Sequence, residues 1–152
     1  MKRIIVLGAT IVVGILTITS LASGKSMQAA ASSTYKAVLN AGQVTPSPKG
    51  TKAGASGTFK ATLTGTTLKW TLTYTHLTGP AVAAHIHLGA RGKNGIALVA
   101  LCGPPSCKSP MSGSANSVTD DVGALMLKAG AYVNVHTNKN PEGEIRGEIT
   151  GH

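Results

Sequence analysis

The 152-residue sequence predicts an all-β domain, a Greek-key-like β-sandwich or flattened barrel of about seven strands with one short helix. The clearest evidence is the alternation of apolar and polar residues over 59–64 and 68–74, two runs joined by Gly65-Thr66. This pattern is typical of a β-hairpin with one face in water. Further strands are predicted at 35–39, 82–88, 96–101, 132–137 and 144–150. Many short strands separated by turns favour a sandwich or barrel.

The connections follow from turn residues. Segments rich in Gly, Pro, Ser and Asn predict loops at 41–57 and 103–116. Lys93-Asn94-Gly95 predicts an Asn-Gly turn, because both residues tolerate positive φ.

One helix of about ten residues is expected after Thr119, which has the position of an N-cap. Asp120 and Asp121 would lie in its first turn, and Gly130 would end it. Its apolar face would consist of Leu125, Met126 and Ala129.

Residues 1–31 are predicted to be a signal peptide and its cleavage region. Lys2-Arg3 is followed by an uncharged run over 4–18 and by small residues at 20–22 and 29–31. The alternative is a retained anchor, because 4–22 is close to the ~20 residues that span a bilayer. Gly, Ser and Thr dilute this run, which favours cleavage. We therefore expect a secreted, periplasmic or cell-surface monomer with a single domain over 32–152 and no membrane segment after cleavage.

The chain is basic, with a formal net charge of +9. This charge favours anionic partners such as surface polymers. The lysines are scattered singly, and one Trp, three Tyr and one Phe offer little base stacking, so we expect no nucleic-acid binding. We interpret the scatter as a solubility feature.

Cys102 and Cys107 are the two cysteines of the chain. An exported chain meets an oxidising compartment, and Pro104-Pro105 forces the intervening segment to turn. We predict a Cys102–Cys107 disulfide; the alternative is a thiolate metal ligand or a redox pair.

Strand periodicity places three histidines on one face of the predicted sheet. Residues alternate faces along a strand, so His85 and His87 oppose the apolar set of 82–86, and His136 opposes Val133 and Val135. Two imidazoles at i and i+2 on a strand, with a third from a neighbouring strand, can chelate one metal ion, and such a set suits copper or zinc. The competing interpretation is a solvated polar sheet face. No role is expected for His76 or His152.

The same periodicity places Asn134, Glu144 and Arg146 beside these histidines. The strands on either side of 138–143 can pair with His136 opposite Glu144 or opposite Arg146, and both registers keep the apolar residues on one face. Glu144 would hold an imidazole N–H and strengthen that ligand, whereas Arg146 would attract an anion. We find no Gly-x-Ser-x-Gly elbow and no Gly-rich phosphate loop after a strand, so the sequence favours a binding protein over an enzyme.

Residues 77–95 (LTGPAVAAHIHLGARGKNG) and 131–148 (AYVNVHTNKNPEGEIRGE) resemble the central and closing motifs of the CHRD (chordin-type) family. The resemblance covers about 35–150. It implies the fold, together with an extracellular setting like that of chordin, but it implies no particular activity.

A fainter likeness links the chain to the copper side of Cu/Zn superoxide dismutases. His85, His87 and His136 would match copper ligands, and Arg146 would match an anion-guiding arginine. The zinc loop and the bridging histidine have no counterpart. Three hypotheses follow: a copper site, an extracellular module that binds a protein or an anionic polymer, and a dismutase-like enzyme.

The signal-peptide hypothesis predicts a mature N-terminus between Ser23 and Ser32. N-terminal sequencing of protein from its native host tests this prediction. An intact Met1 in the membrane fraction would contradict it.

Overall fold

The computed structural model describes residues 31–105, 107–116, 118–128 and 130–151. The signal-peptide prediction therefore lies outside the described residues, apart from Ala31. The elements are β1 (Ser32–Asn40), η1 (Ala41–Gln43), β2 (Ser56–Thr64), β3 (Thr67–Thr75), β4 (Ala81–Leu88), β5 (Ile96–Cys102), β6 (Met111–Asn116), α1 (Asp120–Lys128), β7 (Ala131–Thr137), β8 (Ile145–Glu148) and β9 (Thr150–Gly151).

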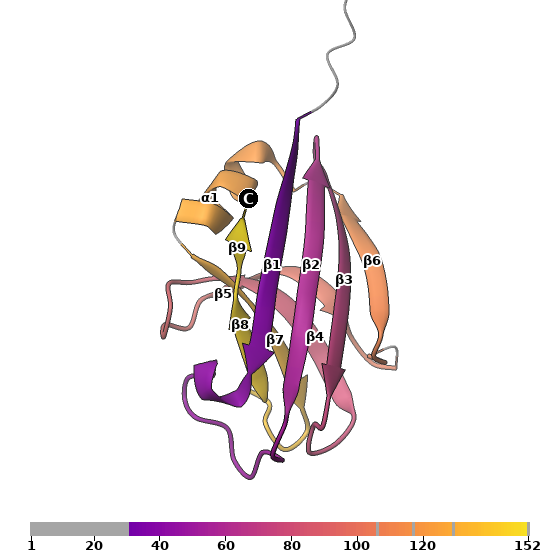
Figure 1. Cartoon of the computed structure of the whole chain (residues 1–152), viewed down its shortest axis with the longest axis vertical. Helices are drawn as coiled ribbons and strands as arrows, with labels where there is room; N and C mark the ends of the chain where they lie inside the picture. Colours follow the sequence, from indigo (N-terminus) through magenta and orange to yellow (C-terminus); the bar gives the residue numbers. More distant parts are fainter. Residues whose placement is uncertain (1–30, 106, 117, 129, 152) are drawn as a thin grey trace, which may run out of the picture.

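The strands form one antiparallel sheet in the order β5-β4-β7-β8-β1-β2-β3-β6, and β9 pairs with β1. Figure 1 shows β1, β2, β3 and β6 lying across β4, β5, β7 and β8. The sheet is thus nearly closed into a flattened barrel, which confirms the predicted all-β class with one short helix. None of the described helices is long and apolar enough to cross a membrane.

The core lies between the two layers. The predicted hairpin is present, with Phe59 opposite Leu72 and Leu63 opposite Leu68. Exposed and buried residues alternate along both strands. Their apolar side chains meet those of the other layer, and the fully buried ones include Leu39, Leu68, Leu72, Ile86, Val133, Val135 and Ile145.

The prediction of a loop over 103–116 is wrong in its second half, which forms the edge strand β6. Its sequence, MSGSAN, has low β-propensity and gave no strand signal. The strand exists because it pairs with β3, placing Gly113 opposite Trp70. A Cβ on Gly113 would lie 2.5 Å from Cζ2 of Trp70, so the absent side chain makes room for the indole.

The predicted Asn94-Gly95 turn is also wrong. The chain turns at Ala90–Lys93 instead, where the Lys93 N–H donates to the Ala90 carbonyl at 2.9 Å and Gly92 takes φ 71°. Gly95 is needed for another reason: a Cβ there would lie 1.4 Å from the carbonyl oxygen of Leu88.

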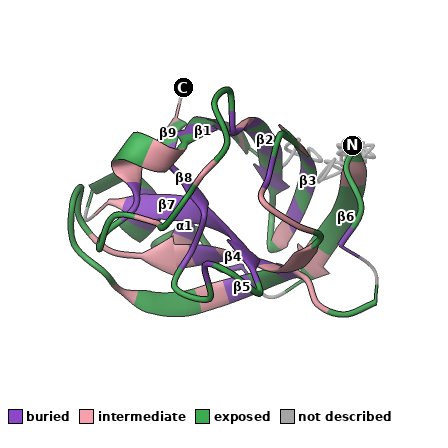
Figure 2. Cartoon of the chain, turned by 90° about the horizontal axis from the view of Figure 1, so that it is seen from below, coloured by how far each residue is buried: buried purple, intermediate pink, exposed green. Residues whose placement is uncertain are grey.

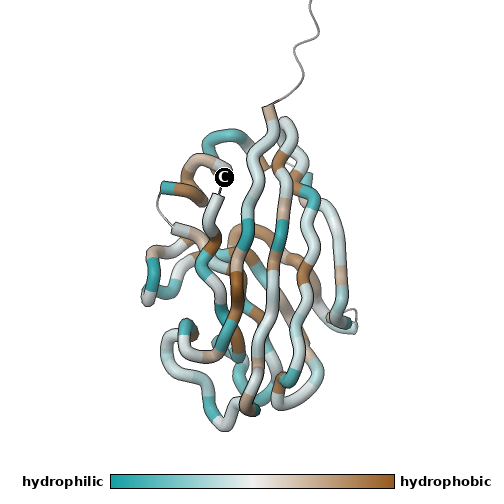
Figure 3. Tube along the Cα trace, in the orientation of Figure 1, coloured by the Kyte–Doolittle hydropathy of each residue, from teal (hydrophilic) through white to brown (hydrophobic). Residues whose placement is uncertain are grey.

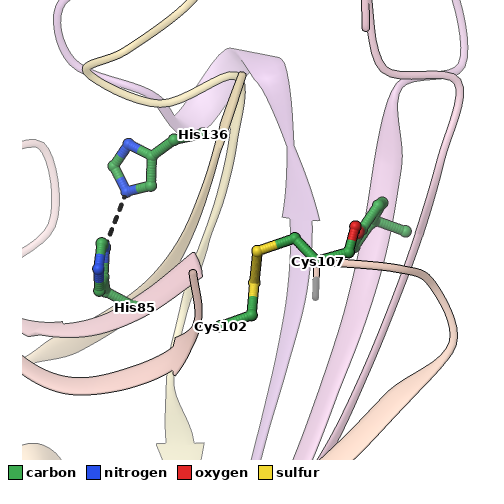
Figure 4. The surroundings of a disulfide bond; sticks show 5 residues. His85, Cys102, Cys107 and His136 are labelled. Carbon is green, nitrogen blue, oxygen red and sulfur yellow. Dashed lines mark hydrogen bonds between the residues drawn. A yellow bond between two sulfur atoms is a disulfide. The ribbon is translucent and has the colours of Figure 1, made fainter. Parts of the chain in front are cut away.

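The helix and the disulfide agree with prediction. The Thr119 hydroxyl accepts from the Val122 N–H at 3.4 Å, as an N-cap does. Met126 is buried, but Leu125 is 43% exposed, so it lies off the apolar face; Ala129 lies outside the described residues. Cys102 and Cys107 form a disulfide (Figure 4).

We predict that Gly113→Val destabilises the domain although valine has the higher strand propensity. The new side chain must displace the Trp70 indole, and overpacking of this kind costs about 1–3 kcal/mol. Urea unfolding followed by tryptophan fluorescence measures the loss. Ser114→Val is the control, because Ser114 is exposed on the same strand; it should change the free energy of unfolding by no more than about 0.5 kcal/mol. Equal stability of the two variants would contradict the packing argument.

Candidate metal centre

Three histidines from two adjacent strands meet on one face of the sheet. β4 and β7 are antiparallel neighbours, with His85 opposite Asn134, His87 opposite Tyr132 and Ala83 opposite His136. Alternation along each strand sends the intervening residues into the core, where Ala84, Ile86, Val133 and Val135 have no exposed surface.

The three imidazoles are close enough to share one ion. Nδ1 of His85 lies 3.2 Å from Nε2 of His136, and Figure 4 shows the two rings directed at each other. The ring centroids of His85 and His87 are 5.5 Å apart, and those of His87 and His136 are 6.0 Å apart. One ring nitrogen from each histidine lies within 4.8 Å of the other two. The structure therefore brings together the three histidines selected from the sequence.

Two backbone carbonyls orient the rings. Nδ1 of His136 lies 2.8 Å from the Pro141 oxygen, and Nδ1 of His87 lies 3.1 Å from the Gly95 oxygen. A carbonyl oxygen can only accept, so both Nδ1 atoms carry the proton and both Nε2 atoms offer a lone pair. Nε2 of His87 is buried and has no hydrogen-bond partner among the described residues. An imidazole fixed at one nitrogen by a carbonyl, with the other nitrogen unused, is the usual arrangement of a metal ligand.

The surroundings keep the three rings neutral. Burial lowers the pKa of His85, and its neighbour His87 lowers it further. Burial also lowers the pKa of His87; the Gly95 carbonyl opposes this effect and Arg146 adds to it. The pKa of His136 is lowered mainly by burial, although the Pro141 carbonyl opposes the shift. Lone pairs are therefore available at neutral pH.

Tyr132 joins the histidine cluster to Arg146. Its ring stacks on His87 with centroids 4.9 Å apart and 5° between the planes. The Arg146 guanidinium lies 3.4 Å from the centroid of the same ring. The Tyr132 hydroxyl accepts from the Gly95 N–H at 3.1 Å, which fixes the segment whose carbonyl holds His87.

The competing interpretation, a solvated polar sheet face, does not hold for β7. Every residue of β7 is buried, and His136 is only 9% exposed, whereas His85 and His87 are half-buried. In Figure 2 β7 carries the colour of buried residues. The turns at 89–95 and 138–143 supply the carbonyls described above and so lie over this face.

The three expected partners of the histidines form their side-chain hydrogen bonds with other groups. Of the two registers expected for β7 and β8, the structure has the one that puts His136 opposite Glu144. Asn134 then lies opposite Arg146, and Val135 lies opposite Ile145. The Glu144 carboxylate nevertheless turns away from His136 and accepts at 2.6 Å from the Thr78 N–H and from the Thr78 and Thr137 hydroxyls.

Arg146 and Asn134 are occupied by other groups. Arg146 donates to the Glu148 carboxylate and to the carbonyls of Lys93 and Ala90, and it is 1% exposed. The Asn134 amide donates to the Glu142 carbonyl at 2.9 Å. Neither side chain forms a hydrogen bond to a histidine among the described residues.

Sequence reasoning missed Tyr132, Gly95 and Pro141. Tyr132 could have been found, because it shares the phase of Asn134 and His136 along β7. The carbonyl acceptors of Gly95 and Pro141 could not be found in this way, because backbone oxygens carry no sequence signal and their positions depend on how the turns fold back.

The family model for the CHRD domain matches residues 35–149. The chain belongs to the CHRD family. Both histidine-bearing strands, β4 and β7, lie within the match, so the histidine cluster is part of the CHRD domain itself. CHRD is a domain of the extracellular type. The comparisons found no match among curated proteins and none among solved structures.

The position of Glu144 generates a pH prediction. Burial raises the pKa of this fully buried carboxyl, but hydrogen bonds from Thr137, Thr78 and Asn140 outweigh that effect and leave the pKa below its ordinary value of 4.5. A carboxyl whose pKa is depressed by folding stabilises the folded state above its unfolded pKa. That stabilisation is lost as pH falls through the folded pKa.

Glu144→Gln should therefore lower the free energy of unfolding by about 1–3 kcal/mol at pH 7. The difference from wild type should shrink below pH 4.5. Urea unfolding at both pH values measures this, with Glu142→Gln as an exposed control. A pH-independent difference would show that the charge of Glu144 does not matter.

Proposed function

We propose that this CHRD domain is exported and binds one copper ion through His85, His87 and His136. The observation that carries the proposal is the convergence of three ring nitrogens within 4.8 Å. Two of these rings are already held at their other nitrogen by backbone carbonyls. Such a site could store copper, deliver it or buffer its redox state.

The spacing of the nitrogens suits a first-row metal. An ion about 2.0 Å from each imidazole nitrogen holds pairs of nitrogens at roughly 3.2–4 Å. His85 Nδ1 and His136 Nε2, at 3.2 Å, already lie in this range. Because His136 Nε2 accepts in this contact, the neutral His85 ring must carry its proton on Nε2 instead of Nδ1 when it binds the ion. The ring nitrogen of His87 lies within 4.8 Å of the other two, so a small inward movement of this side chain completes the site. Binding would also give the buried Nε2 of His87 a partner.

The donor set favours copper. Imidazole suits copper and zinc, and Cu²⁺ leads the divalent affinity order. Carboxylates, which would favour harder ions, are directed elsewhere: Glu144 binds Thr78 and Thr137, and Glu148 binds Arg146. Zinc with three histidines and a water ligand is the competing outcome.

The dismutase alternative has less support than simple copper binding. An anion-guiding arginine needs a free guanidinium edge that faces solvent near the metal. Arg146 is 1% exposed, stacks on Tyr132, and donates to Glu148 and to two carbonyls. Its charge is therefore used to fix the turn at 89–95.

Export rests on three features taken together. The N-terminal sequence has the charge and small-residue pattern of a cleaved signal. The Cys102–Cys107 disulfide is typical of an oxidising compartment. The domain family is of the extracellular type.

Calorimetric titration of the purified, untagged mature protein with Cu²⁺ and with Zn²⁺ tests the metal site. We expect one copper ion per chain, bound more tightly than zinc. His85→Ala, His87→Ala and His136→Ala should each weaken copper binding by at least about tenfold, because each removes one of three ligands.

His76→Asn is the matched control. His76 is exposed and takes φ 56°, a conformation that asparagine tolerates, so the substitution removes an imidazole with little strain. Copper affinity should be unchanged. Unchanged affinity in all three cluster variants, or an equal loss in the control, would contradict the copper site; tighter zinc binding would replace copper with zinc.

A further inference from the structure

The outer face of β1, β2 and β3 carries a concentration of lysine and threonine. Its exposed residues alternate with core residues along each strand. Those at the centre of the face are Thr34, Lys36, Lys60, Thr62, Lys69 and Thr71. This face lies on the layer opposite the histidine cluster (Figure 1).

Strand register gathers lysines that are scattered in the sequence. Lys36 of β1 lies directly opposite Lys60 of β2. Lys69 of β3 pairs with Thr62, which makes it the diagonal neighbour of Lys60. Figure 3 shows hydrophilic bands at the same level on β1 and β2. Like charges directly opposite each other destabilise a sheet, so this arrangement carries a cost that simple solubility does not explain.

Two adjoining hollows follow this line of charge. One, of about 460 Å³, is lined by Lys36, Lys60 and Lys69 together with threonines. The other, of about 560 Å³, shares Lys36 and Lys60 and adds Arg91 from the turn beside β1. The four cations form a stripe, Lys69–Lys60–Lys36–Arg91, which runs across the strands; we call it the basic stripe.

The acidic residues do not neutralise the basic stripe. The chain has five of them. Asp120 and Asp121 lie in α1, while Glu142 and Glu144 lie in the turn before β8. Glu148 borders the second hollow, but its carboxylate is paired with Arg146 at 2.8 Å.

We propose that the basic stripe binds a linear anionic polysaccharide laid across β1, β2 and β3. Strands about 4.8 Å apart place the lysines at short, regular intervals that suit a chain of repeating anionic groups. The flanking threonine hydroxyls can donate to and accept from sugar hydroxyls. This is a second binding surface, independent of the proposed copper site.

A polysaccharide fits this face better than a nucleic acid or a membrane. Tyr35 and Trp70, the aromatic residues that line the first hollow, are 3% and 7% exposed and belong to the core, so they offer no platform for bases. Val38 is the large apolar residue exposed on this part of β1. One valine offers little to insert into lipid, because interfacial binding scales with the buried apolar area.

The test measures binding of the purified protein to heparin and alginate oligosaccharides, with neutral dextran for comparison, over a range of salt concentrations. We expect saturable binding to both anionic polymers and none to dextran. Replacing Lys36, Lys60 and Lys69 together by Gln should weaken binding at least about tenfold and flatten its salt dependence, because fewer counterions are released. The thermal midpoint should stay equal or rise, since the repulsion between Lys36 and Lys60 is removed.

The matched control replaces Lys52, Lys108 and Lys128 by Gln. These exposed lysines lie in two loops and in α1, so the net charge changes equally away from the basic stripe. Binding should change less than about twofold. Equal losses of binding in the two triple variants would overturn the proposal that the basic stripe is the binding site. Tighter binding to duplex DNA, or to phosphatidylglycerol vesicles, would overturn the polysaccharide assignment.

Discussion

The burial of β7 on both faces is the constraint on which the site depends. One face packs Val133 and Val135 into the core, and the other carries Tyr132, Asn134 and His136. Buried polar groups must find hydrogen bonds, and on a central strand the backbone groups are already committed to the ladder. The turns at 89–95 and 138–143 fold back and supply a partner for each of these side chains: the Gly95 N–H for Tyr132, the Glu142 carbonyl for Asn134 and the Pro141 carbonyl for His136. The packing of these turns therefore also sets the orientation of the histidine rings. Arg146 stabilises both, because it donates to two carbonyls of the turn at 89–95 and stacks on Tyr132.

Periodicity along single strands predicted the fold class and the three histidines, because those features are local. The same reasoning failed where the structure of a segment depends on another segment that pairs with it or covers it. β6 has the composition of a loop and is a strand because β3 pairs with it and Trp70 needs the space at Gly113. The competing interpretation of a solvated face fails for the same reason: alternation tells which side of the sheet a residue faces, but not what covers that side. Glu144 was placed correctly in register, yet its carboxylate found the hydroxyls of Thr78 and Thr137 instead of a histidine.

The lysines are the opposite case, because strand register reveals a cluster of charges that the sequence does not show. Lys36, Lys60 and Lys69 lie in three different strands and look like isolated solubilising charges. Pairing puts two of them directly across from each other and the third one step away. The same layer leaves its inner face to the core, so the charged residues of its strands are concentrated outside. A single sheet thus separates two chemistries: neutral imidazoles under loops on one layer and open cations on the other.

The separation matters because the two surfaces place opposite demands on their surroundings. A metal centre of neutral imidazoles needs partial burial, which here lowers the pKa of all three histidines, and it needs second nitrogens held in place. A surface for a polyanion needs open, hydrated cations that can approach a flexible chain.

Arg146 and Arg91 show how two residues of the same charge can serve these two different surfaces. The first is buried and spends its donors on Glu148 and two carbonyls, whereas the second, exposed on the turn that Arg146 fixes, remains available to solvent. The turn at 89–95 therefore links the two surfaces physically, since its carbonyl at Gly95 orients His87 and its Arg91 extends the basic stripe.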